Sequence, residues 1–224
     1  MSVAVLVPAA GRGERLGGAG PKAFQLLGGE PVVVHALRAL QSCPDVGHLV
    51  VAAPPDALSE MESALVAAGL RPGWSVVAGA DHRQSSVAAA LAALDTSDDV
   101  VLVHDAARCL VPVEVVQRVV DAVRAGADAV VPVLPVSDTV KQVDGDRVVA
   151  TVDRSRLRAV QTPQGFRRDV LERAYAHPGE VATDDAGLAE RAGATVRAVA
   201  GHAEAFKVTG PLDLVLAEAV LAAR

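Results

Sequence analysis

The chain has 224 residues, enough for one α/β domain with a sizeable core. Of these residues 51% are hydrophobic but only 2% are aromatic, so the core must consist of Val, Leu and Ala. Its formal net charge of −6 argues against a nucleic-acid partner, because phosphate backbones favour a basic face. No apolar run is long enough to span a bilayer and no signal peptide precedes the first strand, so we expect a cytoplasmic protein without a membrane partner.

The first predicted element is a strand over residues 3–7, followed by a glycine-rich loop. The strand is a short, apolar, β-branched run, typical of a strand buried on both faces of a parallel sheet, and a proline ends it. Five glycines between residues 9 and 20 let the backbone take positive φ and bring N–H groups close to a ligand. Arg12, Arg15 and Lys22 add positive charge. Backbone donors and cations at the carboxyl end of a buried strand predict a polyphosphate site.

Three nucleotide-binding loops compete for this stretch. A Walker A loop requires Gly-Lys followed by Ser or Thr, but Pro21 precedes Lys22 and Ala23 follows it. A dinucleotide-binding fingerprint requires G-x-G-x-x-G, but Leu16 takes the place of the third glycine. The nucleotidyltransferase pattern, A-A-G-x-G-x-R with a later P-K, fits at every position over residues 9–22. A glycine-rich surface loop with incidental charges is the alternative interpretation.

The middle of the chain alternates between helical and strand patterns, as expected for a parallel sheet covered by helices. We expect helices over residues 31–42, 57–68, 86–94 and 112–125, and strands over residues 49–53, 76–78, 100–103 and 129–133. Asp56 is expected to cap the second of these helices, and Ser85 or Ser86 the third. Pro132 predicts an edge position or an irregular end for the last strand, because proline has no N–H to donate.

Polar residues follow the strand over residues 76–78. Gly79 ends this strand and a polar turn opens the next helix, which on its own indicates only a capped helix. The functional interpretation places Asp81, Arg83 and Ser86 at the same sheet edge as the glycine-rich loop.

A second polar cluster follows the strand over residues 100–103. His104, Asp105 and Arg108 stand within five residues at its carboxyl end, where α/β enzymes place their chemistry. A structural salt bridge is the alternative interpretation of this cluster.

Residues 136–158 predict a β-hairpin arm. Residues 140–143 and 147–152 have strand patterns on either side of an Asp144–Gly145 turn signal. No helix follows to cover the hairpin, and an uncovered hairpin is only marginally stable. A second subunit is the simplest cover, so we expect a homodimer formed through this arm.

The last third of the chain completes the domain. We expect helices over residues 168–176, 186–192 and 211–222, and strands over residues 196–199 and 204–208. Asp184 and Asp185 are expected to cap a helix and do no more, whereas Lys207, at a strand end, is expected to serve a site. The whole pattern predicts one Rossmann-like α/β domain over residues 1–224, with a mostly parallel central sheet, flanking helices and the protruding arm.

The motifs of the chain together resemble those of the 2-C-methyl-D-erythritol 4-phosphate cytidylyltransferase family, nucleotidyltransferases of the non-mevalonate (MEP) route of isoprene biosynthesis. They are P-A-A-G-R-G-E-R…P-K (8–22), G-A-D-H-R-Q-S-S (79–86), H-D-A-A-R (104–108), D-T-V-K (138–141), V-D-R (152–154), T-P-Q-G-F (162–166), T-D-D-A (183–186) and K-V-T (207–209). The first motif is shared by the whole superfamily, whereas H-D-A-A-R combined with T-P-Q and T-D-x-A is much narrower. The likeness covers nearly the whole chain.

The resemblance implies transfer of CMP from CTP to 2-C-methyl-D-erythritol 4-phosphate, giving 4-diphosphocytidyl-2-C-methyl-D-erythritol and pyrophosphate. It implies catalytic roles for Arg15 and Lys22 at the α-phosphate, and for Arg154 and Lys207 at the attacking phosphate. The nucleotide-binding residues that it implies are Pro8, Ala9, Ala10, Gly11, Gly13, Gly79, Asp81 and Ser86. Those implied for the polyol phosphate are Asp105, Ala106, Arg108, Thr139 and Thr162. The implied cofactor is Mg²⁺ or another divalent cation, held mainly by the CTP phosphates, with Asp105 as the candidate protein ligand.

The residues are consistent with this chemistry. A phosphate monoester is an adequate nucleophile near neutral pH, so positioning and charge neutralisation by Arg and Lys can supply the rate without a strong base. Three positions depart from the family's pattern: Cys109 replaces a usual proline, Ala80 a common glycine, and Gly210 a larger residue. None of these departures removes a charge from the implied centre.

Three other functions remain open on the sequence. The nearest is a cytidylyltransferase for another polyol phosphate, such as ribitol 5-phosphate, although those relatives tend to have H-D-S-V-R where this chain has H-D-A-A-R. A sugar-1-phosphate nucleotidyltransferase often has an added C-terminal domain, which this sequence does not contain. A non-catalytic nucleotide sensor would not need Arg154 and Lys207, since these residues are implied to position a second substrate.

Overall fold

The computed structural model describes residues 3–11, 21–95, 98–176 and 181–224. Its centre is a sheet in the order β10-β7-β11-β6-β1-β4-β5, with β12 paired to β7. The strands of this sheet are β1 (Val3–Pro8), β4 (Val46–Ala53), β5 (Trp74–Ala78), β6 (Val100–Val103), β7 (Ala129–Pro135), β10 (Arg158–Val160), β11 (Gln164–Arg167) and β12 (Val196–Ala200). β1 is parallel to β4 and β6, β4 to β5, and β12 to β7, whereas β10 and β11 are antiparallel to their neighbours. The prediction of a mostly parallel sheet is therefore confirmed.

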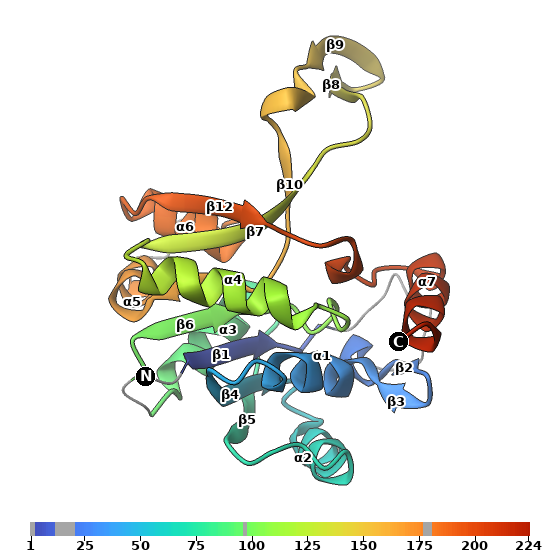
Figure 1. The fold of residues 1–224 in the computed structure, drawn as a ribbon, viewed down its shortest axis with the longest axis vertical. Helices are drawn as coiled ribbons and strands as arrows, with labels where there is room; N and C mark the ends of the chain where they lie inside the picture. The colour runs from blue at the N-terminus through green and yellow to red at the C-terminus, as the bar shows by residue number, and fades with distance from the viewer. Residues whose placement is uncertain (1–2, 12–20, 96–97, 177–180) are drawn as a thin grey trace.

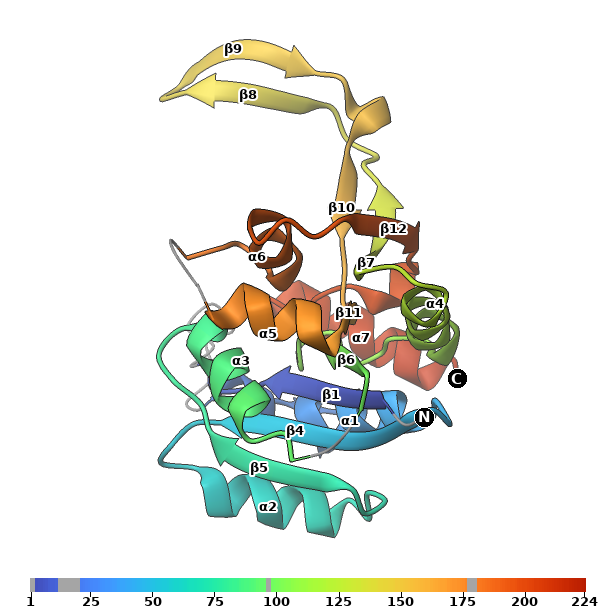
Figure 2. The ribbon, with the colours of Figure 1, turned by 90° about the vertical axis from the view of Figure 1, so that its left-hand side faces the viewer.

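Helices cover both faces of the sheet (Figures 1 and 2). α1 (Val32–Gln41), α2 (Leu58–Ala67) and α4 (Val113–Arg124) contribute to one apolar cluster, and α3 (Arg83–Ala92), α5 (Arg168–Ala176) and α6 (Asp185–Arg191) to another. Alternate residues of β1 divide between them: Val5 belongs to the first and Leu6 to the second, both with 0% exposure. The run of residues 3–7 is thus buried on both faces, as its composition predicts.

A third, smaller cluster joins the C-terminal helix to the segment after the glycine-rich loop. It contains residues of α7 (Pro211–Ala222) and of β2 (Leu26–Leu27), which pairs with β3 (Glu30–Pro31). The short helix η2 (Lys22–Phe24) packs on the first cluster instead, through Ala23 and Phe24, and contacts α1. Within the described ranges, none of the helices combines the length and apolarity needed to cross a bilayer.

Some local predictions are wrong for identifiable reasons. α2 is preceded by Ala57 and has no side-chain cap, so Asp56 does not cap it. α3 begins at Arg83, which places Ser86 inside the helix instead of at its cap. The predicted strand over residues 204–208 is absent, because Ala203–Ala205 forms the short helix η4 and the following residues are irregular.

Pro132 lies in the interior strand β7, at the point where the partner on one side of β7 changes from β11 to β10. β11 pairs with β7 only at Ala129 and Val130, whereas β10 pairs with it only from Val133 onward. Between them, the Pro132 carbonyl accepts the N–H of Gln161 at 2.8 Å. The prediction of an edge position or an irregular end is therefore wrong, since β7 continues to Pro135 and β12 pairs along its other side.

The arm is a separate two-stranded sheet of β8 (Val140–Asp144) and β9 (Arg147–Val152). Gly145 has a φ of +59°, as the Asp-Gly turn signal predicts. The hairpin stands away from the body of the domain in both views (Figures 1 and 2). Val143, Val148 and Val149 are 58%, 55% and 47% exposed, so the arm presents apolar side chains that nothing in the described chain covers.

Candidate active site

The parallel strands bring three polar segments to one edge of the sheet. β1, β4, β5 and β6 run in the same direction, so their carboxyl ends meet there. The segments that follow β1, β5 and β6 carry most of the predicted site residues, and this edge is where ligands bind in open α/β sheets.

The segments after β1 and β5 are in contact. A Cβ added at Gly79 would lie 2.6 Å from the Cβ of Ala10 and 3.1 Å from Ser86 Oγ, so only glycine permits this approach. The buried Ser86 hydroxyl accepts the N–H of Ala80 at 2.9 Å, which fixes the turn between strand and helix. The structure therefore brings Ala10, Gly79 and Ser86 together, as the sequence predicts, with Asp81 exposed beside them.

The other nucleotide-loop residues divide between described and undescribed parts of the chain. Ala9 is buried and its N–H donates to the Ala52 carbonyl at 2.8 Å, while Gly11 is exposed at the strand end. Pro8 is the last residue of β1. Gly13 and Arg15 lie outside the described residues.

Lys22 returns the chain to this edge. Its backbone N–H donates to the carbonyl of Gly11 at 3.2 Å, and its side chain is half-buried. The Lys22 ammonium also helps to lower the pKa of Asp213, although the hydrogen bond from the Thr209 hydroxyl is the larger cause. Lys22 therefore lies between the glycine-rich loop and the start of α7.

Asp105 is held between two cations. Arg83 Nε donates to Oδ1 and Lys207 Nζ donates to Oδ2, each at 2.8 Å. Burial alone would raise the pKa of this carboxyl, but Arg83 and Lys207 outweigh it and hold the pKa well below its usual range. Asp105 is therefore an ionised acceptor at neutral pH.

The ion-pair network continues behind Arg83. Arg83 Nη2 lies 2.7 Å from Oδ2 of Asp185, whose side chain is only 1% exposed. The hydroxyl of Tyr175 donates to the other oxygen of Asp185 at 2.6 Å, and burial together with the Asp185 charge raises the pKa of Tyr175 well above its usual range. Two carboxylates and two cations thus form a network without net charge.

His104 is a structural residue. It is fully buried, and burial lowers its pKa from 6.5 to about 4, so the ring is neutral at pH 7. Its Nδ1 lies 3.1 Å from the hydroxyl of Thr162 and its Nε2 lies 3.3 Å from the carbonyl of Arg108. Thr162 in turn accepts the N–H of Asp105 at 3.0 Å. These contacts are satisfied with the ring proton on Nε2, so His104 orients Thr162 and the Asp105 backbone.

The Arg108 guanidinium binds backbone carbonyls. Nη1 donates to Ala205 at 2.8 Å and Nη2 to Val160 at 3.2 Å, and burial lowers the pKa of the group. Arg108 thus joins the segment after β6 to β10 and to the segment carrying Lys207. Its neighbour Ala106 is buried, at 6% exposure.

Two predicted residues are not brought to this edge within one chain. Arg154, in the short helix η3 (Arg154–Arg156), is exposed and donates to the carbonyl of Ser137. Thr139, which precedes β8, is also exposed. Both belong to the arm, which stands away from the body (Figure 2).

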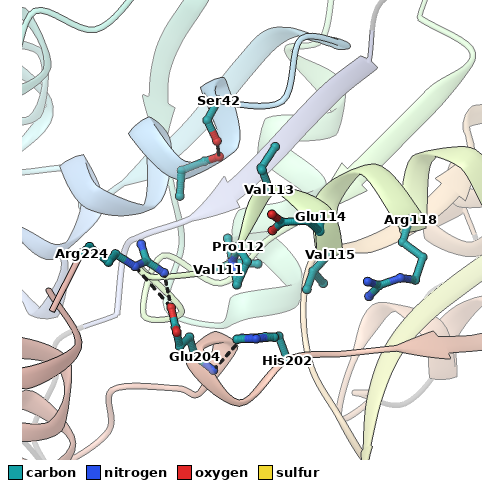
Figure 3. A pocket seen from close by; sticks show the side chains of 11 residues that line it. Ser42, Val111, Pro112, Val113, Glu114, Val115, Arg118, His202, Glu204 and Arg224 are labelled. Carbon is teal, nitrogen blue, oxygen red and sulfur yellow. Dashed lines mark hydrogen bonds and ion pairs between the residues drawn. The ribbon is translucent and has the colours of Figure 1, made fainter.

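A large groove lies elsewhere on the domain. It has a volume of about 600 Å³ and is bordered by α1, α4 and the C-terminus (Figure 3). The groove is lined by Arg118, Glu114 and the Glu204–Arg224 ion pair (2.6 Å). None of the predicted site residues is among its lining residues. The charged edge around Asp105 is the better candidate, because convergent charged groups, and not volume, identify a site for phosphates.

The described residues contain no group of three or more His, Cys, Asp or Glu side chains arranged to hold a metal ion. Asp105 is the acidic residue at the centre of the site, and both of its oxygens are engaged by Arg83 and Lys207. Mg²⁺ commonly binds through one or two carboxylates together with substrate phosphates, and a single carboxylate fits that mode.

The sequence analysis gave Asp185 only a capping role, which is wrong, and did not single out Tyr175. Asp184 makes the predicted cap, since its Oδ1 accepts the N–H of Gly187 at 2.9 Å. Asp185 points into the interior instead, and a cap motif gives no signal for that second carboxylate. Arg83 was placed at the correct edge, but its role as a bridge between Asp105 and Asp185 depends on side-chain packing.

The sequence model of the family described as 2-C-methyl-D-erythritol 4-phosphate cytidylyltransferase (IspD) matches residues 3–223 of the chain. Proteins of that name from Streptomyces avermitilis and Saccharopolyspora erythraea are 55% and 56% identical to it. Each alignment covers 99% of this chain, with 92% and 100% of the respective relative.

Solved structures of proteins with this or an equivalent name also superpose on the chain. The enzyme of that name from Thermus thermophilus is 40% identical and superposes with a TM-score of 0.79, covering 98% of both chains. The 4-diphosphocytidyl-2C-methyl-D-erythritol synthase from Anaerococcus prevotii is 26% identical with a TM-score of 0.86, covering 99% of this chain and 96% of the other.

Proposed function

We infer that the chain, which belongs to the 2-C-methyl-D-erythritol 4-phosphate cytidylyltransferase family, transfers CMP from CTP to 2-C-methyl-D-erythritol 4-phosphate at the sheet edge around Asp105. In this reaction, an oxygen of the polyol phosphate attacks the α-phosphorus of CTP. The bond from the α-phosphorus to the bridging oxygen breaks, and pyrophosphate leaves. The products are 4-diphosphocytidyl-2-C-methyl-D-erythritol and pyrophosphate.

The observation that carries the assignment to this edge is the ion pair between Asp105 and Lys207. The Lys207 side chain is 39% exposed, whereas that of Asp105 is 11% exposed. A cation that is accessible at the rim of a charged site can bind an incoming phosphate, and a buried carboxylate below it can accept hydrogen bonds from the polyol hydroxyls. We assign the polyol phosphate to Asp105, Ala106, Arg108 and Thr162, with Lys207 at its phosphate.

The nucleotide is assigned to the adjoining segments. Ala10 and Gly79 lie close together at the carboxyl ends of β1 and β5, and Ser86 fixes the turn beside them. Backbone donors and acceptors at fixed positions suit the edge of a pyrimidine. We assign the cytidine to Pro8, Ala9, Ala10, Gly11, Gly13, Gly79, Asp81 and Ser86.

Catalysis in this proposal depends on charge and positioning. His104 is buried, neutral and committed to Thr162, so it does not serve as a base for the substrate. The phosphate monoester needs no such base, because it is already ionised near neutral pH. Arg15 and Lys22 neutralise the charge that accumulates on the α-phosphate, and Arg154 and Lys207 align the attacking phosphate.

A divalent cation, Mg²⁺ or another, is proposed as cofactor. The chemistry that it would supply there is neutralisation of phosphate charge, which favours departure of pyrophosphate. Asp105 is the residue that would hold it from the protein side. The phosphates of CTP would supply the remaining ligands.

The arm is proposed to form a homodimer. Its exposed valines need a partner surface, and Thr139 and Arg154 lie on it, away from the edge that they are assigned to serve. If two chains exchange arms across a two-fold axis, each arm is covered and delivers these residues to the partner's site. A cytoplasmic location remains a prediction that cell fractionation checks.

The reaction is tested by pyrophosphate release from CTP with and without each polyol phosphate. We expect release with 2-C-methyl-D-erythritol 4-phosphate and little with ribitol 5-phosphate. Comparable rates with both substrates would favour a cytidylyltransferase of broader polyol-phosphate specificity. Absence of pyrophosphate release with either substrate would overturn the assignment.

A further inference from the structure

The two cations that hold Asp105 differ in how firmly they are fixed. Arg83 is bound at both ends, by Asp105 at 2.8 Å and by Asp185 at 2.7 Å. Lys207 makes its ion pair with Asp105 and extends from an irregular segment, with a side chain that is 39% exposed. Arg83 is therefore a fixed counter-ion, and Lys207 is a counter-ion that can change partner.

We propose that Arg83 is a positioning residue that keeps the buried Asp105 carboxylate neutralised when Lys207 leaves it to bind the phosphate of the second substrate. This inference rests on the proposed function and deepens it. It assigns a role to a residue that does not itself touch the substrate.

The need for such a residue follows from the cost of burying charge. An ionised carboxylate that loses its partner inside a protein is strongly destabilised. If Lys207 alone neutralised Asp105, an incoming phosphate could recruit Lys207 only by leaving that carboxylate unpaired. Arg83 removes most of this cost, because its hydrogen bond to Oδ1 does not depend on Lys207.

Asp185 explains why Arg83 stays in place. It is wholly buried, and its second oxygen accepts the hydroxyl of Tyr175 at 2.6 Å. The helix cap beside it is made by Asp184, so the Asp185 carboxylate is not needed there. A planar guanidinium can bind two carboxylates at once with separate N–H groups, which a single ammonium does less well.

The test removes Arg83 together with its anchor. The double variant Arg83→Gln/Asp185→Asn deletes one positive and one negative charge, so the net charge of the site is unchanged. Asp105 loses its ion pair with Arg83 and keeps only Lys207 as a counter-ion, while position 185 no longer carries a charge that needs one. We expect the KM for 2-C-methyl-D-erythritol 4-phosphate to rise about tenfold or more, as for the loss of a charged hydrogen bond, while the KM for CTP stays within about twofold. The single variant Arg83→Lys keeps the charge and should recover part of the loss.

The matched control is Arg173→Gln/Asp169→Asn, which removes an exposed ion pair (2.6 Å) on α5 with the same balance of charge. It should leave both KM values unchanged. The thermal midpoint of each variant separates stability from substrate binding. Equal changes in both KM values, or no change in a folded double variant, would overturn the proposal. Failure of the wild-type protein to release pyrophosphate would instead contradict the proposed function itself.

Discussion

Asp105 and Lys207 form an ion pair with a distance of 2.8 Å between Oδ2 and Nζ, although 102 positions of sequence separate them. Asp105 follows the central strand β6, and Lys207 follows the short helix η4 near the end of the chain. The pair therefore closes the site between the sheet and the C-terminal segment. In the proposed function, Lys207 is the cation that receives the phosphate of the second substrate.

Replacement of Lys22 by Ala should lower kcat by ~10²-fold or more with a smaller change in either KM, because a preorganised donor to the α-phosphate is lost in the transition state. Steady-state pyrophosphate release measures both parameters. Arg173→Ala, on the exposed face of α5, is the control and should leave them unchanged. A Lys22→Ala protein with a near-normal kcat would restrict this residue to binding.

Replacement of Gly79 by Ala should impair nucleotide binding. The added Cβ would lie 2.6 Å from the Cβ of Ala10, so the segments after β1 and β5 must separate. We expect a larger rise in the KM for CTP than in that for the polyol phosphate, with a destabilisation of about 1–3 kcal/mol typical of overpacking. Substrate titrations and denaturant unfolding measure the two effects. An unchanged KM for CTP would show that the base binds elsewhere.

The stability of the protein should fall in mildly acidic solution because of His104. Its pKa is about 4 in the folded protein and 6.5 as its ordinary value, so the unfolded chain binds the proton first as pH falls. The contribution of the neutral His104 ring to the free energy of unfolding is present above pH 6.5 and declines between pH 6.5 and about 4. It amounts to about 3 kcal/mol at most. Denaturant unfolding at several pH values measures it.

The control for this prediction is His104→Gln, which removes the titrating ring and retains polar atoms. Its free energy of unfolding at pH 7 should be lower, but its slope between pH 6.5 and about 4 should be shallower than that of the wild type. Parallel slopes for the two proteins would contradict the burial of a neutral histidine.

Exchange of the arm can be tested by complementation between inactive chains. Lys22→Ala chains and Arg154→Ala chains are mixed and allowed to exchange subunits. In a mixed dimer with exchanged arms, one site receives both defects and the other neither, so random pairing should restore roughly a quarter of wild-type activity. Recovery near zero, with exchange confirmed by mass, would show that Arg154 serves its own subunit or that no dimer forms.

Much of the fold could be predicted because the sequence patterns are local. The apolar run of β1 and the Asp-Gly turn of the arm appear as expected, and α7 spans Pro211–Ala222 as predicted. The segment of residues 204–208 was misassigned as a strand, because it has no neighbouring strand to pair with among the described residues.

The site was predictable where parallel strands align their ends, and less so where side chains decide. Ala10 and Gly79 meet because they follow β1 and β5, the parallel strands on either side of β4, and Ser86 lies in the helix after β5. The ion pair of Arg83 with Asp185 could not be inferred, since adjacent aspartates at a helix start have the pattern of a cap whether or not one of them is buried.

The most direct measurement of the central claim is the kinetics of a Lys207→Ala variant with each substrate varied in turn. If the second substrate binds at the edge formed by Asp105 and Lys207, the KM for 2-C-methyl-D-erythritol 4-phosphate should rise by about tenfold or more, the KM for CTP should stay near the wild-type value, and kcat should also fall because the attacking phosphate is no longer aligned. A Lys207→Ala protein whose KM for the polyol phosphate and kcat both equal those of the wild type would contradict the claim.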